Sequence, residues 1–299
     1  MKKRFLALLT ICAILAMTGC ASAQPAQPAA SASEPKLVKT VTEYAVEYET
    51  KDWTAVRVFE YTYENGYPVE IKTTELEWDG IIANTYEYTF EEGVPVSRTE
   101  YNSDGVQTQI MEYNEGRPYH AMSASVDGIS KGDIYYAYAN GDEYMTLLLS
   151  ANHGYQDGQL SDTMEEVDSV EVTTENGLLK KTVNSGMYAN WGVQDEKEWM
   201  RFNGTYTANY DENGIVTDTS GIFRAGPSGP QYKIEKTMEN GLVTELVKQV
   251  PDNDPDTWMN ESKYTFEYTD TAISQSRYAQ MINYFALGEF NQYYAYNWY

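Results

Sequence analysis

Apolar and polar side chains alternate over long parts of this chain. Phe59, Tyr61 and Tyr63 alternate with Glu60 and Thr62, which is the period of a β-strand that has one dry face and one wet face. Three further faces of this kind are Asn84-Tyr86-Tyr88-Phe90, Val170-Val172-Thr174 and Tyr206-Ala208-Tyr210. The pattern predicts a domain built from β-strands.

Turn signals separate the predicted strands at regular intervals. Glycines that follow Asn, Asp, Glu or another turn residue recur every 11 to 14 residues in the first half of the chain, at positions 66, 80, 93, 105, 116, 128 and 141. Asn-Gly and Asp-Gly tolerate the positive φ that tight hairpin turns require. Pro68, Pro95 and Pro118 each stand two residues after such a glycine, where a strand start tolerates a missing N–H. This spacing predicts consecutive hairpins of an up-and-down meander.

The second half of the chain is less regular. Residues 152–166, 226–230 and 251–256 are polar or rich in turn residues, and we interpret them as loops. Between them, Glu-Asn-Gly or Asp-Glu-Asn-Gly turns return and end at Gly177, Gly214 and Gly241.

The chain changes character near its end, where helical spacing replaces alternation. The apolar residues there fall at i, i+3, i+4, i+7 and i+8, the face of a helix over about residues 272–287. They are Tyr278, Met281, Ile282, Phe285 and Ala286. We expect Thr271 to cap this helix and Gly288 to end it. Residues 291–299 are aromatic on both strand faces and predict a closing strand.

These elements predict an all-β fold: a long antiparallel up-and-down meander, curled into a barrel or a strongly curved sheet, with one short C-terminal helix. An open meander would leave two exposed edges that invite aggregation. We therefore expect closure or near-closure, with the helix covering or plugging an opening.

The start of the chain predicts export. Lys2, Lys3 and Arg4 precede an apolar run over residues 5–17, which is too short to span a bilayer and has the pattern of a signal peptide. The run ends in Met-Thr-Gly-Cys at residues 17–20, which resembles the bacterial lipobox, although Met17 stands where Leu is usual. The alternative is an ordinary signal peptide cut near residues 21–23.

The lipobox resemblance implies a three-part organisation. Residues 1–19 would be a lipoprotein signal peptide, and Cys20 would carry the acyl chains, such as palmitate, that anchor the protein in the membrane. Residues 20–36 hold this cysteine and a flexible tether of small residues, Pro and Gln. Residues 37–299 would form the β-meander domain.

Composition limits the partners and the sources of stability. The chain has 21 Lys and Arg against 45 Asp and Glu, a net charge of −24. Without Lys2, Lys3 and Arg4 the charge is −27, so we expect no nucleic-acid partner. The two cysteines are Cys12, in the signal, and Cys20, so the exported domain would have no disulfide and would depend on packing of its many aromatic rings.

No pattern of catalytic residues or cofactor ligands stands out. The two histidines, His120 and His153, form no zinc motif, and the run at residues 252–256 lacks the glycine and glutamate of a calcium loop. The Gly-Pro-Ser-Gly-Pro run at 226–230 suits a turn better than a serine elbow. Pairs of carboxylates are too numerous to be informative. The six tryptophans fit a β core better than sugar platforms; they are Trp53, Trp78, Trp191, Trp199, Trp258 and Trp298. We predict no catalytic, cofactor-binding or metal-binding residue, and no cofactor.

The turn motif resembles the YD repeat of Rhs-type proteins. Residues 210–216 (YDENGIV) match that motif best, and residues 101–106 (YNSDGV) are close. The chain as a whole resembles gut-bacterial lipoproteins of unknown function that have a porin-like β-meander domain. The YD-repeat resemblance implies a scaffold, a shell or a surface-binding role and supplies no catalytic residue.

Together these features predict an exported, envelope-anchored bacterial lipoprotein that faces away from the cytoplasm. We expect a non-enzymatic binding or scaffold module displayed on the cell surface as a monomer, with a glycan or protein ligand. The alternative is a glycan-binding or glycan-cleaving envelope protein. An outer-membrane pore is disfavoured, because the positions opposite the apolar faces carry Glu, Thr and Lys.

Overall fold

The structure of the protein is a computed structural model. It describes residues 34–47, 49–77, 80–124, 131–138, 144–156, 159–189, 199–222, 231–252 and 257–288. Sixteen strands and one helix occur in these residues. They are β1 (Lys36–Val46), β2 (Trp53–Glu64), β3 (Tyr67–Glu75), β4 (Gly80–Glu91), β5 (Val94–Tyr101), β6 (Gln107–Asn114), β7 (Arg117–Ala124), β8 (Lys131–Tyr138), β9 (Met145–Gln156), β10 (Gln159–Glu175), β11 (Leu178–Ala189), β12 (Trp199–Tyr210), β13 (Val216–Ile222), β14 (Tyr232–Glu239), β15 (Leu242–Pro251), β16 (Trp258–Ala272) and α1 (Gln275–Leu287).

The strands form a closed antiparallel barrel in which each strand pairs with its neighbours in sequence. The barrel closes where β1 pairs with β16, with Val41 opposite Phe266 and Glu43 opposite Tyr264. This confirms the predicted all-β meander curled into a barrel with a C-terminal helix. The closing strand expected at residues 291–299 lies outside the described residues, and closure is made by β1 instead.

Tight turns gather at one end of the barrel, because consecutive antiparallel strands alternate in direction. The turns β2–β3, β4–β5, β6–β7, β10–β11 and β14–β15 each consist of two residues with positive φ, the second a glycine such as Gly66 or Gly93. These are the turns that the Asn-Gly and Glu-Gly pairs predicted. Gly80 was wrongly predicted as a turn residue: it begins β4 opposite Glu75. Gly128 and Gly141 lie outside the described residues.

The loop predicted at residues 152–166 is also wrong. β9 extends to Gln156 and β10 begins at Gln159, and the two strands pair through Asn152 opposite Thr163. A hairpin ladder satisfies backbone N–H and C=O groups whatever the side chains are, so a polar stretch can extend a strand. Of the other predicted loops, residues 226–230 and 253–256 lie outside the described residues, and Pro251, predicted to begin a loop, is instead the last residue of β15.

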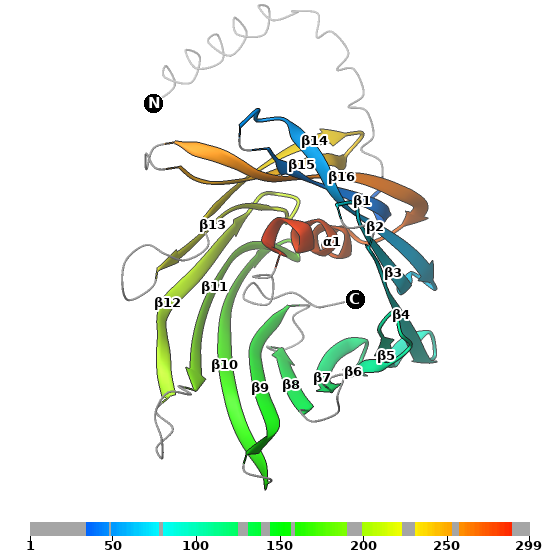
Figure 1. Cartoon of the computed structure of the whole chain (residues 1–299), viewed down its shortest axis with the longest axis vertical. Coiled ribbons are helices and arrows are strands. Elements are labelled where there is room, and N and C mark those ends of the chain that lie inside the picture. Colours follow the sequence, from blue (N-terminus) through cyan, green and yellow to red (C-terminus); the bar gives the residue numbers. More distant parts are fainter. Residues whose placement is uncertain are drawn as a thin grey trace, which may run out of the picture. The chain divides into compact units, whose positions relative to one another are not determined.

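The alternating faces predicted from the sequence are the two faces of the barrel wall. Phe59, Tyr61 and Tyr63 point inward and pack against the core that surrounds α1. Figure 1 shows α1 inside the ring of strands. The core therefore lies between the helix and the inner wall, and the helix fills part of the lumen.

The outer wall carries many polar side chains along β2 to β4, beside the exposed Ile81 of β4. Thr85, Glu87 and Thr89 are exposed on the outer face of β4, and Lys72 Nζ lies 3.1 Å from Glu60 Oε2 between β3 and β2. A barrel wall that faces lipid is instead apolar over about 25 Å.

Helix α1 begins three residues later than the predicted range. Ser274, and not Thr271, is its N-cap, and its Oγ accepts a hydrogen bond from Arg277 N at 3.3 Å. β16 runs to Ala272 and keeps Thr271 in the sheet. At the other end Gly288 caps the helix with positive φ, as expected. α1 is too short and too polar to serve as a transmembrane helix, and no other candidate occurs in the part of the chain that the structure describes.

Candidate functional site

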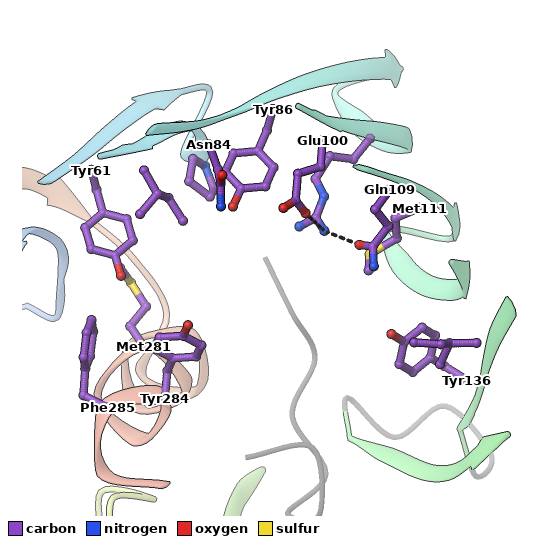
Figure 2. Close-up of a pocket in the computed structure, with 14 residues that line it drawn as sticks. Tyr61, Asn84, Tyr86, Glu100, Gln109, Met111, Tyr136, Met281, Tyr284 and Phe285 are labelled. Atoms are coloured by element: carbon purple, nitrogen blue, oxygen red, sulfur yellow. Dashed lines mark hydrogen bonds and ion pairs between the residues drawn. The ribbon is translucent and has the colours of Figure 1, made fainter. Parts of the chain in front are cut away.

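A cavity of about 350 Å³ lies in the lumen between α1 and the inner faces of β2 to β6 and β8. Figure 2 shows Tyr61 and the helix residues Met281, Tyr284 and Phe285 on one side, and Tyr136 on the other. The rest of the lining is Pro68, Ile71, Asn84, Tyr86, Arg98, Glu100, Gln109, Met111 and Ile134. We refer to this cavity as the lumen pocket.

Strand register brings the polar lining residues together. Tyr86 on β4 lies opposite Glu100 on β5, and Glu100 lies opposite Gln109 on β6. These three side chains therefore form one row across three strands, which we call the polar row. Arg98 stands two residues before Glu100 on the same inward face. Directly opposed residues on one face have Cβ atoms about 4.5–5.5 Å apart, close enough for a shared ligand.

Arg98 is the charged centre of the pocket. Only 8% of its side chain is exposed, its Nη2 donates to Gln109 Oε1 at 3.0 Å, and its guanidinium lies 5.0 Å from the centre of the Tyr86 ring. Burial works to lower the pKa of Arg98, but nearby tyrosines and Glu100 leave the pKa above its ordinary value. The guanidinium is therefore a permanent cation held in place by the pocket wall.

A carboxylate balances this cation. Glu100 Oε2 lies 3.9 Å from Arg98 Nη2. The pocket tyrosines stay uncharged, since burial raises the pKa of Tyr136 to about 12 and also raises the pKa of Tyr86. The charged side chains that line the pocket thus sum to zero, and its phenol groups can both donate and accept hydrogen bonds.

The helix side of the pocket is aromatic and rigidly packed. The Phe285 ring lies 5.3 Å from the Phe59 ring, 5.7 Å from the Phe266 ring and 5.2 Å from the Tyr284 ring, in each case edge to face. Such pairs contribute about 0.5–1.5 kcal/mol beyond their buried area. They fix α1 against β2 and β16 and leave Tyr284 facing the cavity.

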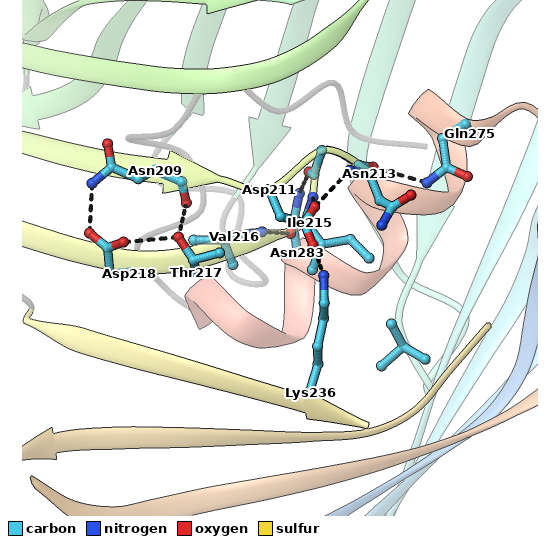
Figure 3. Close-up of polar contacts among 12 residues, drawn as sticks. Asn209, Asp211, Asn213, Ile215, Val216, Thr217, Asp218, Lys236, Gln275 and Asn283 are labelled. Carbon is cyan, nitrogen blue, oxygen red and sulfur yellow. Dashed lines mark hydrogen bonds and ion pairs between the residues drawn. The ribbon is translucent and has the colours of Figure 1, made fainter. Parts of the chain in front are cut away.

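Polar contacts hold α1 to the turn between β12 and β13 (Figure 3). Asn283 Oδ1 accepts from Val216 N, and Asn283 Nδ2 donates to Gly214 O, each at 2.8 Å. Gln275 Nε2 donates to Asn213 O at 2.9 Å. The helix wall of the pocket is therefore tied to the barrel at the end that carries the tight turns.

Within that turn, Asp211 binds backbone N–H groups and pairs with a partly buried cation. Its Oδ1 accepts from Asn213 N at 2.8 Å and from Ile215 N at 3.0 Å. Its Oδ2 forms an ion pair with Lys236 of β14. Residues 210–216, which resemble the YD repeat, thus form a hairpin turn whose aspartate caps backbone N–H groups.

Of the two histidines considered in the sequence, His120 lies on the outer face, away from the pocket. His120 Nδ1 is 3.0 Å from Glu112 Oε2, its Nε2 is 2.7 Å from Asp133 Oδ1, and its ring stacks on Tyr135 at 4.5 Å. Two carboxylates and one imidazole form a polar cluster on the outer wall. Among the described residues, no group of three or more His, Cys, Asp or Glu side chains is arranged so that it could hold a metal ion.

The other sequence candidates do not build a site in the described structure. Trp53, Trp199 and Trp258 begin β2, β12 and β16. The expectation of a core position was wrong for Trp258, whose side chain is exposed at the first residue of its strand. The remaining candidates lie outside the described residues. They are residues 226–230, residues 253–256, Trp78, Trp191, Trp298 and Cys20.

Sequence reasoning missed Arg98, Glu100, Gln109 and Tyr284 as site residues. The available signal was the alternation itself. Arg98 and Glu100 fall on the same face of β5, and Gln109 falls on the inner face of β6. Burying a charged side chain on the dry face of a strand lowers the stability of the fold unless the charge is paired. A charged residue at such a position is therefore a candidate site residue.

Comparisons with known proteins support the fold. No protein-family model matches the sequence, and no curated protein is significantly similar to it. A solved structure described as a porin-like protein from Bacteroides uniformis is similar over 79% of this chain and 100% of its own, with 10% identity and a TM-score of 0.51. A second porin-like protein, from Bacteroides vulgatus, shows the same coverage and identity with a TM-score of 0.47. The similarity to the first of these structures is a similarity of fold.

Proposed function

We propose that this protein is a non-enzymatic binding module of the bacterial cell envelope that holds a small molecule in the lumen of its barrel. The observation that carries the proposal is the lumen pocket. Its volume of about 350 Å³ lies at the lower end of the range of about 300–1,000 Å³ found for ligand sites, which are largely apolar with a few convergent polar groups.

The lining favours binding over hydrolysis. Glu100 is the only carboxylate among the described residues that line the pocket. A glycosidase needs two carboxylates about 5–10 Å apart around the scissile bond. Arg98 is held by Gln109 and lies near Glu100, an arrangement that suits recognition rather than proton transfer.

The wall favours a binding barrel over a membrane-spanning pore. The outer face of β4 exposes Thr85, Glu87 and Thr89, where a lipid-facing wall would be apolar. The helix α1 also occupies part of the lumen through which a pore would conduct.

The envelope location rests on the lipobox-like sequence that ends in Cys20. Acyl chains on Cys20 would hold the protein at the membrane while the barrel faces away from the cytoplasm. The test is incorporation of labelled palmitate during expression in bacteria. Cys20→Ser should abolish the label and Cys12→Ser should retain it.

The binding role is tested by a ligand screen, together with a substitution that fills the pocket. Ile134 lines the pocket, whereas Tyr135, the next residue along β8, is exposed on the outer wall. The full chain in detergent is screened by thermal shift against neutral sugars, uronates, amino acids and medium-chain fatty acids. A ligand at 100 times its dissociation constant adds about 2.7 kcal/mol, and hence at least about 2–4 °C.

We expect one chemical class to raise the melting temperature. Ile134→Trp should remove that shift, because its larger side chain occupies the cavity, and Tyr135→Trp should leave it unchanged. If no class produces a shift, the scaffold role implied by the YD-like turns becomes the better explanation.

A further inference from the structure

We propose that the ligand of the lumen pocket is an uncharged saccharide, one ring of which lies between the polar row and the aromatic residues of α1. This inference rests on the proposed binding function and specifies its ligand class. It follows from three properties of the pocket: its hydrogen-bonding groups, its charge balance and the placement of its rings.

The hydrogen-bonding groups suit a ligand with several hydroxyls. The polar row of Tyr86, Glu100 and Gln109 crosses three adjacent strands, and Asn84 and Arg98 line the pocket beside it. This set combines a carboxylate acceptor, a guanidinium donor, two amides and a phenol. A sugar hydroxyl can donate and accept at once, so neighbouring hydroxyls on one ring can satisfy such a mixed set.

The same groups disfavour an apolar ligand. A fatty acyl chain placed against Asn84, Glu100 and Gln109 would remove water from them without replacing its hydrogen bonds. Unsatisfied buried polar groups are costly, most of all when they carry charge.

The charge balance disfavours an ionised ligand. Glu100 Oε2 lies 3.9 Å from Arg98 Nη2, so a carboxylate ligand drawn to Arg98 would also be repelled by Glu100. A cationic ligand would meet the reverse problem. Like charges in a partly buried site interact strongly because the effective dielectric constant is low, and a neutral ligand avoids both conflicts.

The rings supply the apolar surface that the C–H face of a sugar requires. Tyr61, Tyr136, Tyr284 and Phe285 line the pocket, and Figure 2 shows Tyr284 and Tyr86 facing the same open volume. A tyrosine offers an apolar face and a polar tip in one side chain. A cavity of about 350 Å³ suits a ligand of one or two sugar rings.

Calorimetric titration of the full chain tests the proposal, in a detergent whose headgroup is not a sugar, such as an amine oxide. The probes are glucose, galactose, mannose, N-acetylglucosamine and their disaccharides, with glucuronate, glucosamine and laurate as charged and apolar comparisons. We expect at least one neutral sugar to bind, more tightly than glucuronate, glucosamine or laurate.

Glu100→Gln is the decisive variant, because it keeps the size of the side chain and removes its charge. Loss of a charged acceptor should weaken the neutral sugar about tenfold. Because Arg98 would then be the unbalanced charge, glucuronate should bind more tightly than it does to the unchanged protein. Glu87→Gln, the same change on the exposed outer face of β4, should have no effect on either probe. Thermal melting of both variants checks that the barrel is folded.

The outcomes separate this inference from the proposed function. If glucuronate, glucosamine or laurate binds best and Ile134→Trp removes that binding, the saccharide assignment is overturned while the lumen-binding role stands. If a neutral sugar binds but neither Glu100→Gln nor Ile134→Trp weakens it, the sugar site lies elsewhere and the inference is also overturned. If no probe of any class binds, both are overturned.

Discussion

Asn283 of α1 and Val216 of β13 are joined by a buried hydrogen bond, from Val216 N to Asn283 Oδ1 at 2.8 Å. The same amide donates to Gly214 O at 2.8 Å, and the Asn283 side chain is fully buried. One amide thus satisfies two backbone groups of the β12–β13 turn and ties the helix wall of the pocket to the barrel.

Replacing this amide should detach the helix from the wall. In Asn283→Leu, Val216 N–H and Gly214 C=O would be buried without partners, and each such group costs about 1–3 kcal/mol. We expect a loss of about 2–4 kcal/mol in the free energy of unfolding, measured by urea denaturation. Gln275→Ala, which removes one partly exposed hydrogen bond to Asn213 O, should cost less than about 1 kcal/mol. Equal losses in the two variants would contradict the proposed anchoring role of Asn283.

The ion pair of Asp211 and Lys236 should behave as a coupled unit. Asp211→Asn keeps an oxygen for the backbone N–H groups of Asn213 and Ile215 but leaves Lys236 without its counter-charge. We expect a loss of about 2–3 kcal/mol, somewhat less than for a fully buried pair.

The double variant Asp211→Asn with Lys236→Met completes the cycle. It should be more stable than Asp211→Asn alone, because no unpaired charge remains in the wall. The free energies of unfolding are measured by denaturation for Asp211→Asn, Lys236→Met and the double variant. If the loss in the double variant equals the sum of the two single losses, the pair is not coupled.

Two turn glycines should differ in their tolerance of alanine. Gly214 has φ +75°, and an added Cβ would lie 3.5 Å from the Cβ of Ala279 in α1 and 3.4 Å from the Cβ of Leu178. Gly93 has φ +82° with open space around it. Both substitutions strain the backbone by about 1–2 kcal/mol. We expect Gly214→Ala to lose about 1 kcal/mol more than Gly93→Ala in thermal melts, because the helix must also shift. A larger loss at Gly93 would show that the helix contact is unimportant.

His120 should make stability depend on pH near neutrality. Partial burial lowers the pKa of His120, but hydrogen bonds and charges from Glu112 and Asp133 raise it more, and the net pKa lies above its ordinary value of 6.5. The charged imidazolium is therefore favoured in the folded state. Its contribution is fully present below pH 6.5 and disappears as the pH rises through the raised pKa.

The measurement is the melting temperature as a function of pH for the unchanged protein and for His120→Gln. The difference between the two should be largest in acid and should shrink above neutrality. A difference that grew as the pH rose would have the wrong sign. Tyr135→Leu, which removes the ring stacked on His120 but neither carboxylate, should retain most of the pH dependence.

Particular residues show how far the sequence predicts the fold. The inward face of Tyr86, Tyr88 and Phe90 follows from alternation alone, because successive strand residues point to opposite sides. The polar stretch at 152–166 was wrongly predicted as a loop, since backbone pairing between β9 and β10 does not require apolar side chains. The candidate site was harder to predict, because Glu100 and Gln109 become neighbours only through the register of β5 and β6.

The sequence by itself determined the strand period, the positions of the tight turns and the helical face of residues 278–286. These are local properties, set by side-chain alternation, by residues that tolerate positive φ and by the 3.6-residue spacing of a helix. Only the tertiary structure decided that β1 meets β16, that α1 lies inside the barrel and that Arg98, Glu100 and Tyr284 share one cavity. These contacts join residues as far apart in the sequence as Lys36 and Ala272, and no local pattern encodes which distant surfaces meet when a barrel closes.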